Sequence, residues 1–164
     1  MEKIIRLAGP LVEAKEMSGV KMYEVVKVGE EKLIGEVIKI ERDKASIQVY
    51  ENTEGLKPLE PVEPTGRPLS VELGPGVLKS IYDGIQRPLE LIKKEAGDFI
   101  TRGISIPAID KKKKWEFLPQ VKRGDLVKGG DIIGEIQETK VIKNRVMIPY
   151  GIEGTVEEIE EGKF

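Results

Sequence analysis

The sequence predicts a mainly β protein, in which two β modules are joined by a short helical connector. Short runs of β-branched residues alternate with polar ones before residue 68, prolines crowd the end of that stretch, and glycine–aspartate turns recur near the C-terminus. We expect a small closed β-barrel over residues 1–68, a connector over 69–113, and a glycine-rich, barrel-sandwich-like β module over 114–164.

The first module is predicted from the period of its apolar residues. Ala45, Ile47 and Val49 fall on one face of an extended run, which is the period of a half-buried strand. Closure into a barrel would remove the exposed edges that so few strands would otherwise leave. The expected strands are residues 4–7, 21–28, 33–40 and 45–50.

At the end of the first module, prolines deny the backbone its hydrogen-bond donors, so a stiff connecting segment is expected from about Leu56. These prolines are Pro58, Pro61, Pro64 and Pro68. The turn Gly74-Pro75-Gly76 then ends an extended run and opens a short helix over 77–82. A second helical stretch, 89–94, ends at Ala96-Gly97. Both stretches are too short to be stable alone, so we expect poor protection across 90–114.

The last module carries a repeat. Gly124-Asp125-Leu126-Val127 and Gly130-Asp131-Ile132-Ile133 place a turn before a strand at a spacing of six, and a third turn surrounds Gly151 and Gly154. Lipoyl and biotinyl carriers share this pattern, and Lys140 sits where such a carrier bears its modified lysine. The residues beside Lys140 match neither carrier signature, so a surface lysine on a hairpin is the simpler interpretation.

Composition excludes several kinds of chemistry. The chain has 164 residues and no cysteine or histidine, which excludes disulfides, thiol nucleophiles, imidazole catalysis and zinc sites of the usual kind. A net charge of −2 gives no field that would attract nucleic acid or a membrane. No apolar run has the length of a membrane span and no signal peptide is evident, so we expect a cytoplasmic protein. Glutamate and lysine far outnumber asparagine and glutamine, which indicates a hot archaeal source.

Four other motifs invite functional interpretations. Basic Lys111–Lys114 beside Trp115 and Phe117 could hold nucleic acid in an OB-like manner, although a solvated linker is simpler. Arg123-Gly124-Asp125 is predicted to be a turn, and Gly74-Pro75-Gly76 is no dinucleotide fingerprint. An acidic group near the C-terminus could suggest a divalent-metal site, but a charged strand end fits better: Glu157, Glu158, Glu160 and Glu161.

Residues 65–89, TGRPLSVELGPGVLKSIYDGIQRPL, resemble the join between barrel and nucleotide-binding domain in the catalytic subunit, or alpha chain, of archaeal and vacuolar-type rotary ATP synthases and ATPases. Upstream, Ile4–Val12, Gly35-Glu36-Val37 and Ile47–Leu56 are similar to the family's first barrel. Downstream, Phe99–Asp110, Trp115-Glu116-Phe117 and the run to Phe164 are similar to the insertion particular to this catalytic subunit. At Leu59 and Lys79 the family pattern has glycine.

The resemblance implies an N-terminal part of the catalytic subunit of a proton- or sodium-translocating ATP synthase. Its barrel would help hold a ring of alternating A and B subunits, and its insertion would face the peripheral stalk, with the membrane contacted only through the complex on its cytoplasmic face. The phosphate-binding string GxxxxGK followed by Ser or Thr is missing, since the one Gly-Lys, Gly162-Lys163, precedes Phe164. We therefore expect no catalytic, cofactor-binding or metal-binding residue here, and Mg-ATP bound elsewhere in the whole protein.

Overall fold

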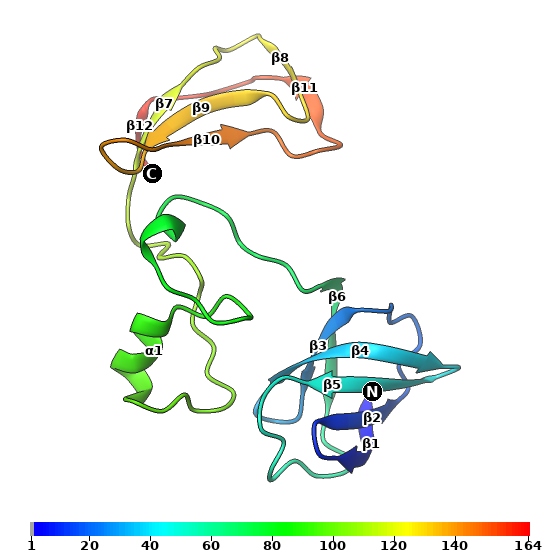
Figure 1. Ribbon diagram of the computed structural model, residues 1–164. Coiled ribbons are helices and arrows are strands. Elements are labelled where there is room, and N and C mark those ends of the chain that lie inside the picture. Colours follow the sequence, from blue (N-terminus) through cyan, green and yellow to red (C-terminus); the bar gives the residue numbers. More distant parts are fainter. Residues whose placement is uncertain (1) are drawn as a thin grey trace. The chain divides into compact units, whose positions relative to one another are not determined.

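Six strands of the N-terminal region form one antiparallel sheet in the computed structural model, which describes residues 2–164 (Figure 1). The strand order is β1-β2-β5-β4-β3-β6. The alternation predicted for residues 45–50 is confirmed, because Ala45, Ile47 and Val49 are buried. The strands are β1 (Lys3–Ala8), β2 (Leu11–Lys15), β3 (Glu24–Val28), β4 (Leu33–Glu41), β5 (Lys44–Val49) and β6 (Val62–Pro68).

The sheet returns on itself just before β6. The Ile4 amide donates to the Glu60 carbonyl at 3.0 Å, the Leu59 amide donates to the Ile4 carbonyl at 2.9 Å, and Lys3 forms an antiparallel bridge with Pro61. The first strand is thus hydrogen-bonded to the residues that lead into the last strand. Full closure of the barrel stays a prediction. The core inside is formed by twelve buried hydrophobic residues: Ile4, Val12, Ala14, Met17, Val26, Val28, Leu33, Val37, Ala45, Ile47, Val49 and Val62.

Two sequence-based expectations for this region need correction. The strand expected over 21–28 begins at Glu24, because residues 21–23 form a turn in which the Glu24 carboxylate accepts the Lys21 amide at 2.9 Å. The proline-rich run is not only a connector, because β6 pairs with β3 along it. β6 stands at the end of the strand order, where missing donors at Pro64 and Pro68 are tolerated.

The helical elements of residues 2–164 are one 3₁₀ turn and one short α-helix. The helix expected over 77–82 is a single 3₁₀ turn, η1 (Val77–Lys79). The predicted helix at 89–94 is confirmed as α1 (Leu89–Ala96), whose chain leaves the helix at Gly97 with a φ of 81°. Ile92 is the buried side chain of α1.

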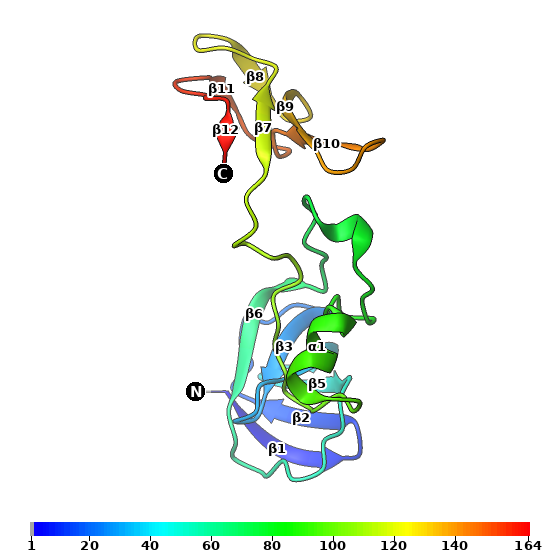
Figure 2. The ribbon, with the colours of Figure 1, turned by 90° about the vertical axis from the view of Figure 1, so that its left-hand side faces the viewer.

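The remaining strands form a four-stranded sheet in the order β10-β9-β7-β12 and a two-stranded sheet of β8 and β11. Figure 2 shows β7 and β12 side by side, in agreement with their pairing of Phe117 with Gly162. The strands are β7 (Glu116–Pro119), β8 (Leu126–Lys128), β9 (Ile132–Gln137), β10 (Lys143–Met147), β11 (Glu153–Thr155) and β12 (Gly162–Lys163).

The predicted glycine–aspartate repeat is confirmed in detail. Asp125 accepts the Lys122 amide and Asp131 accepts the Lys128 amide, each at 2.9 Å. The glycine before each aspartate has a φ of 94°, a left-handed conformation that favours glycine. The two turns have the same local geometry, so a short sequence repeat produces a structural repeat.

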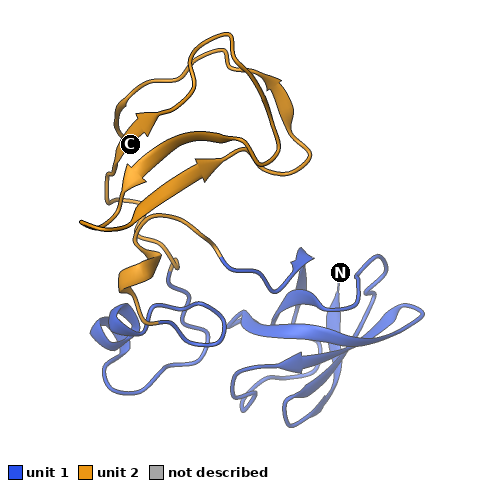
Figure 3. Ribbon diagram, turned by 45° about the horizontal axis from the view of Figure 1, so that its top comes forward, with its two compact units in different colours: residues 1–71, 82–106 blue, residues 72–81, 107–164 orange. Residues whose placement is uncertain are grey.

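The chain divides into two compact units (Figure 3). The first unit contains residues up to 71 and 82–106, and the second unit contains 72–81 and 107–164. Residues 69–113 therefore do not behave as one connector, because their parts belong to different units. The exact boundaries at 68 and 114 stay predictions.

The backbone at Leu59 generates a stability prediction. Leu59 has a φ of 76°, where a β-carbon is strained, whereas Lys79 is not among the residues with positive φ. We expect Leu59→Gly to raise the free energy of unfolding of the first unit by about 1 kcal/mol, because the relieved strain exceeds the added chain entropy. Urea unfolding followed by circular dichroism measures the change.

Lys79→Gly is the matched control, since both positions have glycine in the family pattern. It should not raise the free energy of unfolding of either unit, because the Lys79 backbone has no left-handed strain to relieve. Equal gains from both substitutions would contradict a role for the φ of Leu59.

Candidate functional site

The residues singled out from the sequence do not converge on one site. Lys140 is exposed in the turn between β9 and β10. Thr139 organises that turn, since its hydroxyl accepts the amides of Val141 at 3.3 Å and Ile142 at 3.0 Å. This geometry is that of an ordinary hairpin turn, as the simpler interpretation predicted.

The basic and acidic groups are likewise explained locally. Lys113 Nζ lies 3.9 Å from the centre of the Trp115 ring, and Lys111 Nζ lies 3.2 Å from a Glu72 carboxylate oxygen. The glutamates at 157, 158, 160 and 161 lie in the strand-end segment before β12. Across residues 2–164, no three acidic, histidine or cysteine side chains lie together as a metal site. None of the helices described there is long and apolar enough to cross a membrane.

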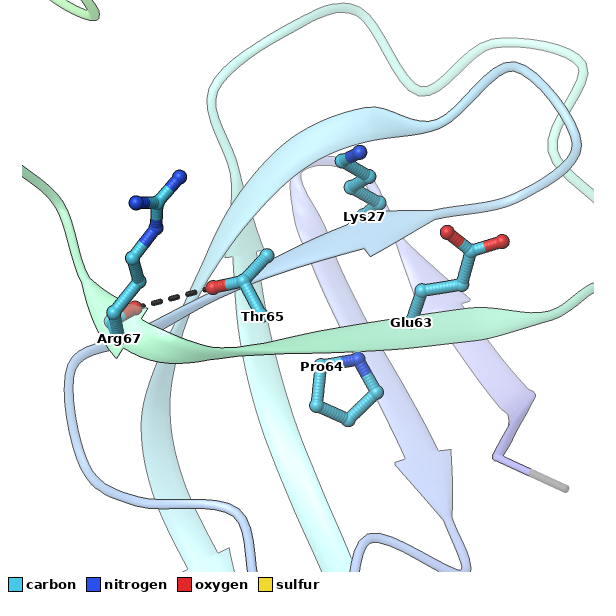
Figure 4. A pocket seen from close by; sticks show the side chains of 5 residues that line it. All are labelled: Lys27, Glu63, Pro64, Thr65 and Arg67. Atoms are coloured by element: carbon cyan, nitrogen blue, oxygen red, sulfur yellow. Dashed lines mark hydrogen bonds between the residues drawn. The ribbon is translucent and has the colours of Figure 1, made fainter.

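A shallow hollow over β3 and β6 is shown in Figure 4. Lys27 and Glu63 are opposite one another in the strand register, and Glu63 also pairs with Lys32 Nζ at 3.2 Å. The Thr65 hydroxyl donates to the Val25 carbonyl at 2.6 Å and reaches the Arg67 carbonyl at 3.2 Å (Figure 4). Glu63 and Thr65 thus have polar partners within the sheet.

The most buried charged cluster was missed by sequence reasoning. The Arg87 guanidinium lies 2.7 Å from Asp83 Oδ2 through Nε and 3.2 Å from Glu51 Oε2 through Nη1. The Gly103 amide donates to the same Glu51 oxygen at 2.9 Å. Only 14% of the Arg87 side chain and 8% of the Glu51 side chain are exposed. We call Glu51, Asp83, Arg87 and the Gly103 amide the Arg87 cluster.

The Arg87 cluster ties the segment 82–106 to the loop that follows β5. A second ion pair acts nearby, since Arg102 Nε lies 2.7 Å from a Glu31 carboxylate oxygen and Nη2 donates to the other at 2.7 Å. Gly103 has a φ of 71°, and a β-carbon there would lie 2.7 Å from the Glu31 carbonyl oxygen. Residues 102 and 103 thus make specific contacts, and the poor protection expected across 90–114 stays a prediction. The sequence shows arginines and carboxylates here, but not which of them meet.

Electrostatics within the cluster favour the ionised forms. Burial alone would raise the pKa of Asp83, but hydrogen bonds from the Arg87 amide, the Arg87 side chain and the Ile85 amide outweigh it and lower this pKa. Burial would likewise lower the pKa of Arg87, yet Asp83 and Glu51 raise it. The cluster is a structural docking point, because its groups are all engaged with one another.

The join around Gly74-Pro75-Gly76 is the remaining candidate. Gly76 precedes η1 with a φ of 103°, and its amide donates to Glu138 Oε1 at 2.7 Å. Beside this turn lie side chains that leave large apolar areas exposed: Leu73 at 78%, Leu78 at 59% and Ile81 at 64%. In the first unit, Phe99 is 85% exposed. Such residues can bind another protein surface, and they provide no catalytic chemistry.

Comparison with known proteins gives a consistent result. Residues 4–66 match the model of the ATP synthase alpha/beta family β-barrel domain, and residues 106–164 match that of the ATP synthase alpha/beta subunit barrel-sandwich domain. These matches agree with the barrel and the barrel-sandwich module predicted from sequence.

Several relatives match 99% of the chain. Three of them are the A subunit of the A-type ATP synthase of Pyrococcus abyssi at 62% identity, the same protein of Thermoplasma acidophilum at 60%, and the V-type ATP synthase alpha chain of Clostridium botulinum at 55%. The chain spans 16%, 21% and 28% of these proteins, respectively. A hot archaeal source stays a prediction, because the relatives include a bacterium.

Arg87→Ala tests the docking role of the cluster. The substitution leaves the Glu51 and Asp83 carboxylates without their cation, and we expect it to weaken the docking of 82–106 by about 3 kcal/mol. The Gly103 amide should then exchange with solvent about 100-fold faster, while the Val49 amide of the barrel, bonded to the Pro10 carbonyl at 2.8 Å, should change little.

Lys93→Ala is the matched control, because the Lys93–Asp98 pair is exposed at 73% and 78%. It should change Gly103 exchange by less than about threefold, as surface ion pairs contribute little. Equal effects of the two substitutions would contradict the assigned role of Arg87.

The lowered pKa of Asp83 predicts a dependence on acid. A carboxyl group with a lower pKa in the folded state stabilises the fold above its ordinary pKa of 3.8 and loses that contribution as the pH falls below it. Asp83→Asn should therefore be less stable at about pH 6, yet lose less stability than the wild type between about pH 6 and about pH 2.5. Parallel losses in urea unfolding would show that Asp83 does not supply this dependence.

Proposed function

We propose a function from the premise that this chain belongs to the ATP synthase alpha/beta family and corresponds to the N-terminal region of the catalytic subunit of an A-type or V-type enzyme. The chain is then an assembly element of a rotary ATP synthase. The observation that carries the proposal is the match along 99% of the chain, together with the two domain models that match residues 4–66 and 106–164. The whole protein would act in ATP synthesis or hydrolysis coupled to proton or sodium transport.

The barrel is proposed to hold a ring of alternating A and B subunits. A six-stranded sheet around a twelve-residue apolar core is a rigid support for such contacts. Outward apolar side chains, including Met22 at 43% and Tyr23 at 60% exposure, are available to a neighbouring protein of the ring. The second unit is proposed to face the peripheral stalk, and the complex to sit on the cytoplasmic face of the membrane.

Nucleotide chemistry is proposed to lie in residues outside this sequence. A phosphate site needs backbone amides converging in a glycine-rich loop together with a lysine, and no string in the 164 residues has that pattern. Neither the carrier hypothesis at Lys140 nor the nucleic-acid hypothesis at Lys111–Phe117 is supported by the relatives found.

An assembly experiment tests this function in the full-length protein. Replacing Met22, Tyr23 and Ile38 with Gln, Asn and Thr should lower the yield of the A–B ring at least about tenfold in sedimentation, since central apolar contacts dominate interface energies. Asparagine suits position 23, where φ is 64°. Mg-ATP binding by the full-length variant should be unchanged.

The 164-residue chain gives the complementary measurement. Calorimetric titration with Mg-ATP should give no one-to-one isotherm at sub-millimolar concentration. A micromolar isotherm would contradict the proposed division of labour, and unaltered ring formation by the triple variant would contradict the role of the barrel surface.

A further inference from the structure

Glu138 is a buried carboxylate with one bonded and one unbonded oxygen. It lies just after β9, only 8% exposed. Its Oε1 accepts the Gly76 amide at 2.7 Å, across a sequence separation of 62 residues. Its Oε2 is buried and has no hydrogen-bond partner among the protein atoms described for residues 2–164. One of the two oxygens of this carboxylate is therefore buried without a hydrogen bond in the described structure.

The bond joins two separate stretches of the second unit, 72–81 and 107–164. Two other contacts of 72–81 differ in kind from this buried bond. The Lys111–Glu72 pair is exposed, and Trp115 lies 3.5 Å from the position that a β-carbon on Gly76 would occupy. A charge-assisted hydrogen bond in a buried place is the stronger kind of contact. Glu138 is thus a buried anchor of the Gly74-Pro75-Gly76 turn.

The same carboxylate also favours release. When the bond breaks and the turn moves away, both oxygens gain water, including Oε2, which has no protein partner among the described residues in the closed form. The hydrogen bond to Oε1 stabilises the closed form, and the lost hydration of Oε2 stabilises the open form relative to it. The two contributions oppose each other, so the free-energy difference between the two forms is small. We propose that Glu138 and Gly76 form a latch, which holds residues 72–81 on the second unit when closed and frees them when open.

The latch changes how the chain connects its units. With the latch closed, the chain passes from one unit to the other at 71–72, 81–82 and 106–107. With the latch open, residues 72–81 belong to neither unit. The peptide bond between residues 106 and 107 is then the one place where the chain leads directly from the first unit into the second. The exposed side chains of Leu73, Leu78 and Ile81 then move with a free loop. This device is independent of the proposed function, because it concerns residues of this chain alone.

Amide hydrogen exchange of the wild-type chain tests for two states. The Gly76 amide should exchange by a local opening that depends weakly on urea. The Gly124 and Gly130 amides, bonded to the carbonyls of Val156 at 2.9 Å and Ile148 at 3.0 Å, should require opening of the second unit and depend on urea more steeply. An identical urea dependence of all three amides would overturn the latch.

Substitution separates the latch from general packing. Glu138→Ala should speed Gly76 exchange at least about tenfold while Gly124 and Gly130 change less than about twofold. Glu138→Gln keeps an acceptor oxygen and should recover most of the protection. Glu158→Ala, at an exposed glutamate, is the control and should have no effect. Trypsin cleavage after Lys79 should accelerate only in Glu138→Ala.

Three results would overturn the proposal. Unchanged Gly76 exchange in Glu138→Ala would show that the bond does not hold the turn. Equal acceleration at Gly76, Gly124 and Gly130 would make Glu138 a packing residue of the whole unit. No recovery in Glu138→Gln would show that accepting the Gly76 hydrogen bond is not what Glu138 does.

Discussion

The Arg87 guanidinium holds the segment 82–106 on the barrel of the first unit. It bridges Asp83 within its own segment and Glu51 on the barrel, and Glu51 also accepts the Gly103 amide. A buried ion pair gains little net free energy over an apolar contact, because its charges lose their hydration. Its effect is on specificity, since a placement of 82–106 that buried these three charged groups apart from one another would leave each of them without a partner. The position of α1 follows from this, because the helix buries little else than Ile92.

The two units are stabilised by different means. Twelve buried hydrophobic residues fill the barrel, and each large one contributes about 2 kcal/mol when it is fully buried. Among the described residues of the second unit, by contrast, no hydrophobic side chain is fully buried. That unit depends on turns, strand pairing and the Glu138 bond to the join. A unit with so thin a core can change its local structure at small cost, which suits a latch.

Local patterns in the sequence predicted local structure well. The alternation at 45–50, the glycine–aspartate turns and the glycine–proline–glycine turn each depend on neighbouring residues, and all are confirmed. The barrel was predicted as closed. The hydrogen bond between Ile4 and Glu60 could not be predicted, because it joins residues that are distant in the sequence. The same holds for Arg87 with Glu51 and for Gly76 with Glu138. Function came from family resemblance, since no string of chemically active residues in this sequence indicates it.

The prolines of β6 have a consequence for how the barrel can meet other proteins. A strand at the end of a sheet ordinarily offers a row of amide donors to which a foreign strand can add. Pro64 and Pro68 have no such donors, and the residues just before β6 are already bonded to β1. The barrel is therefore closed to strand addition from this side. Any neighbouring protein there must be recognised by side chains. Single substitutions can therefore change such a contact without changing the strand pairing of the sheet.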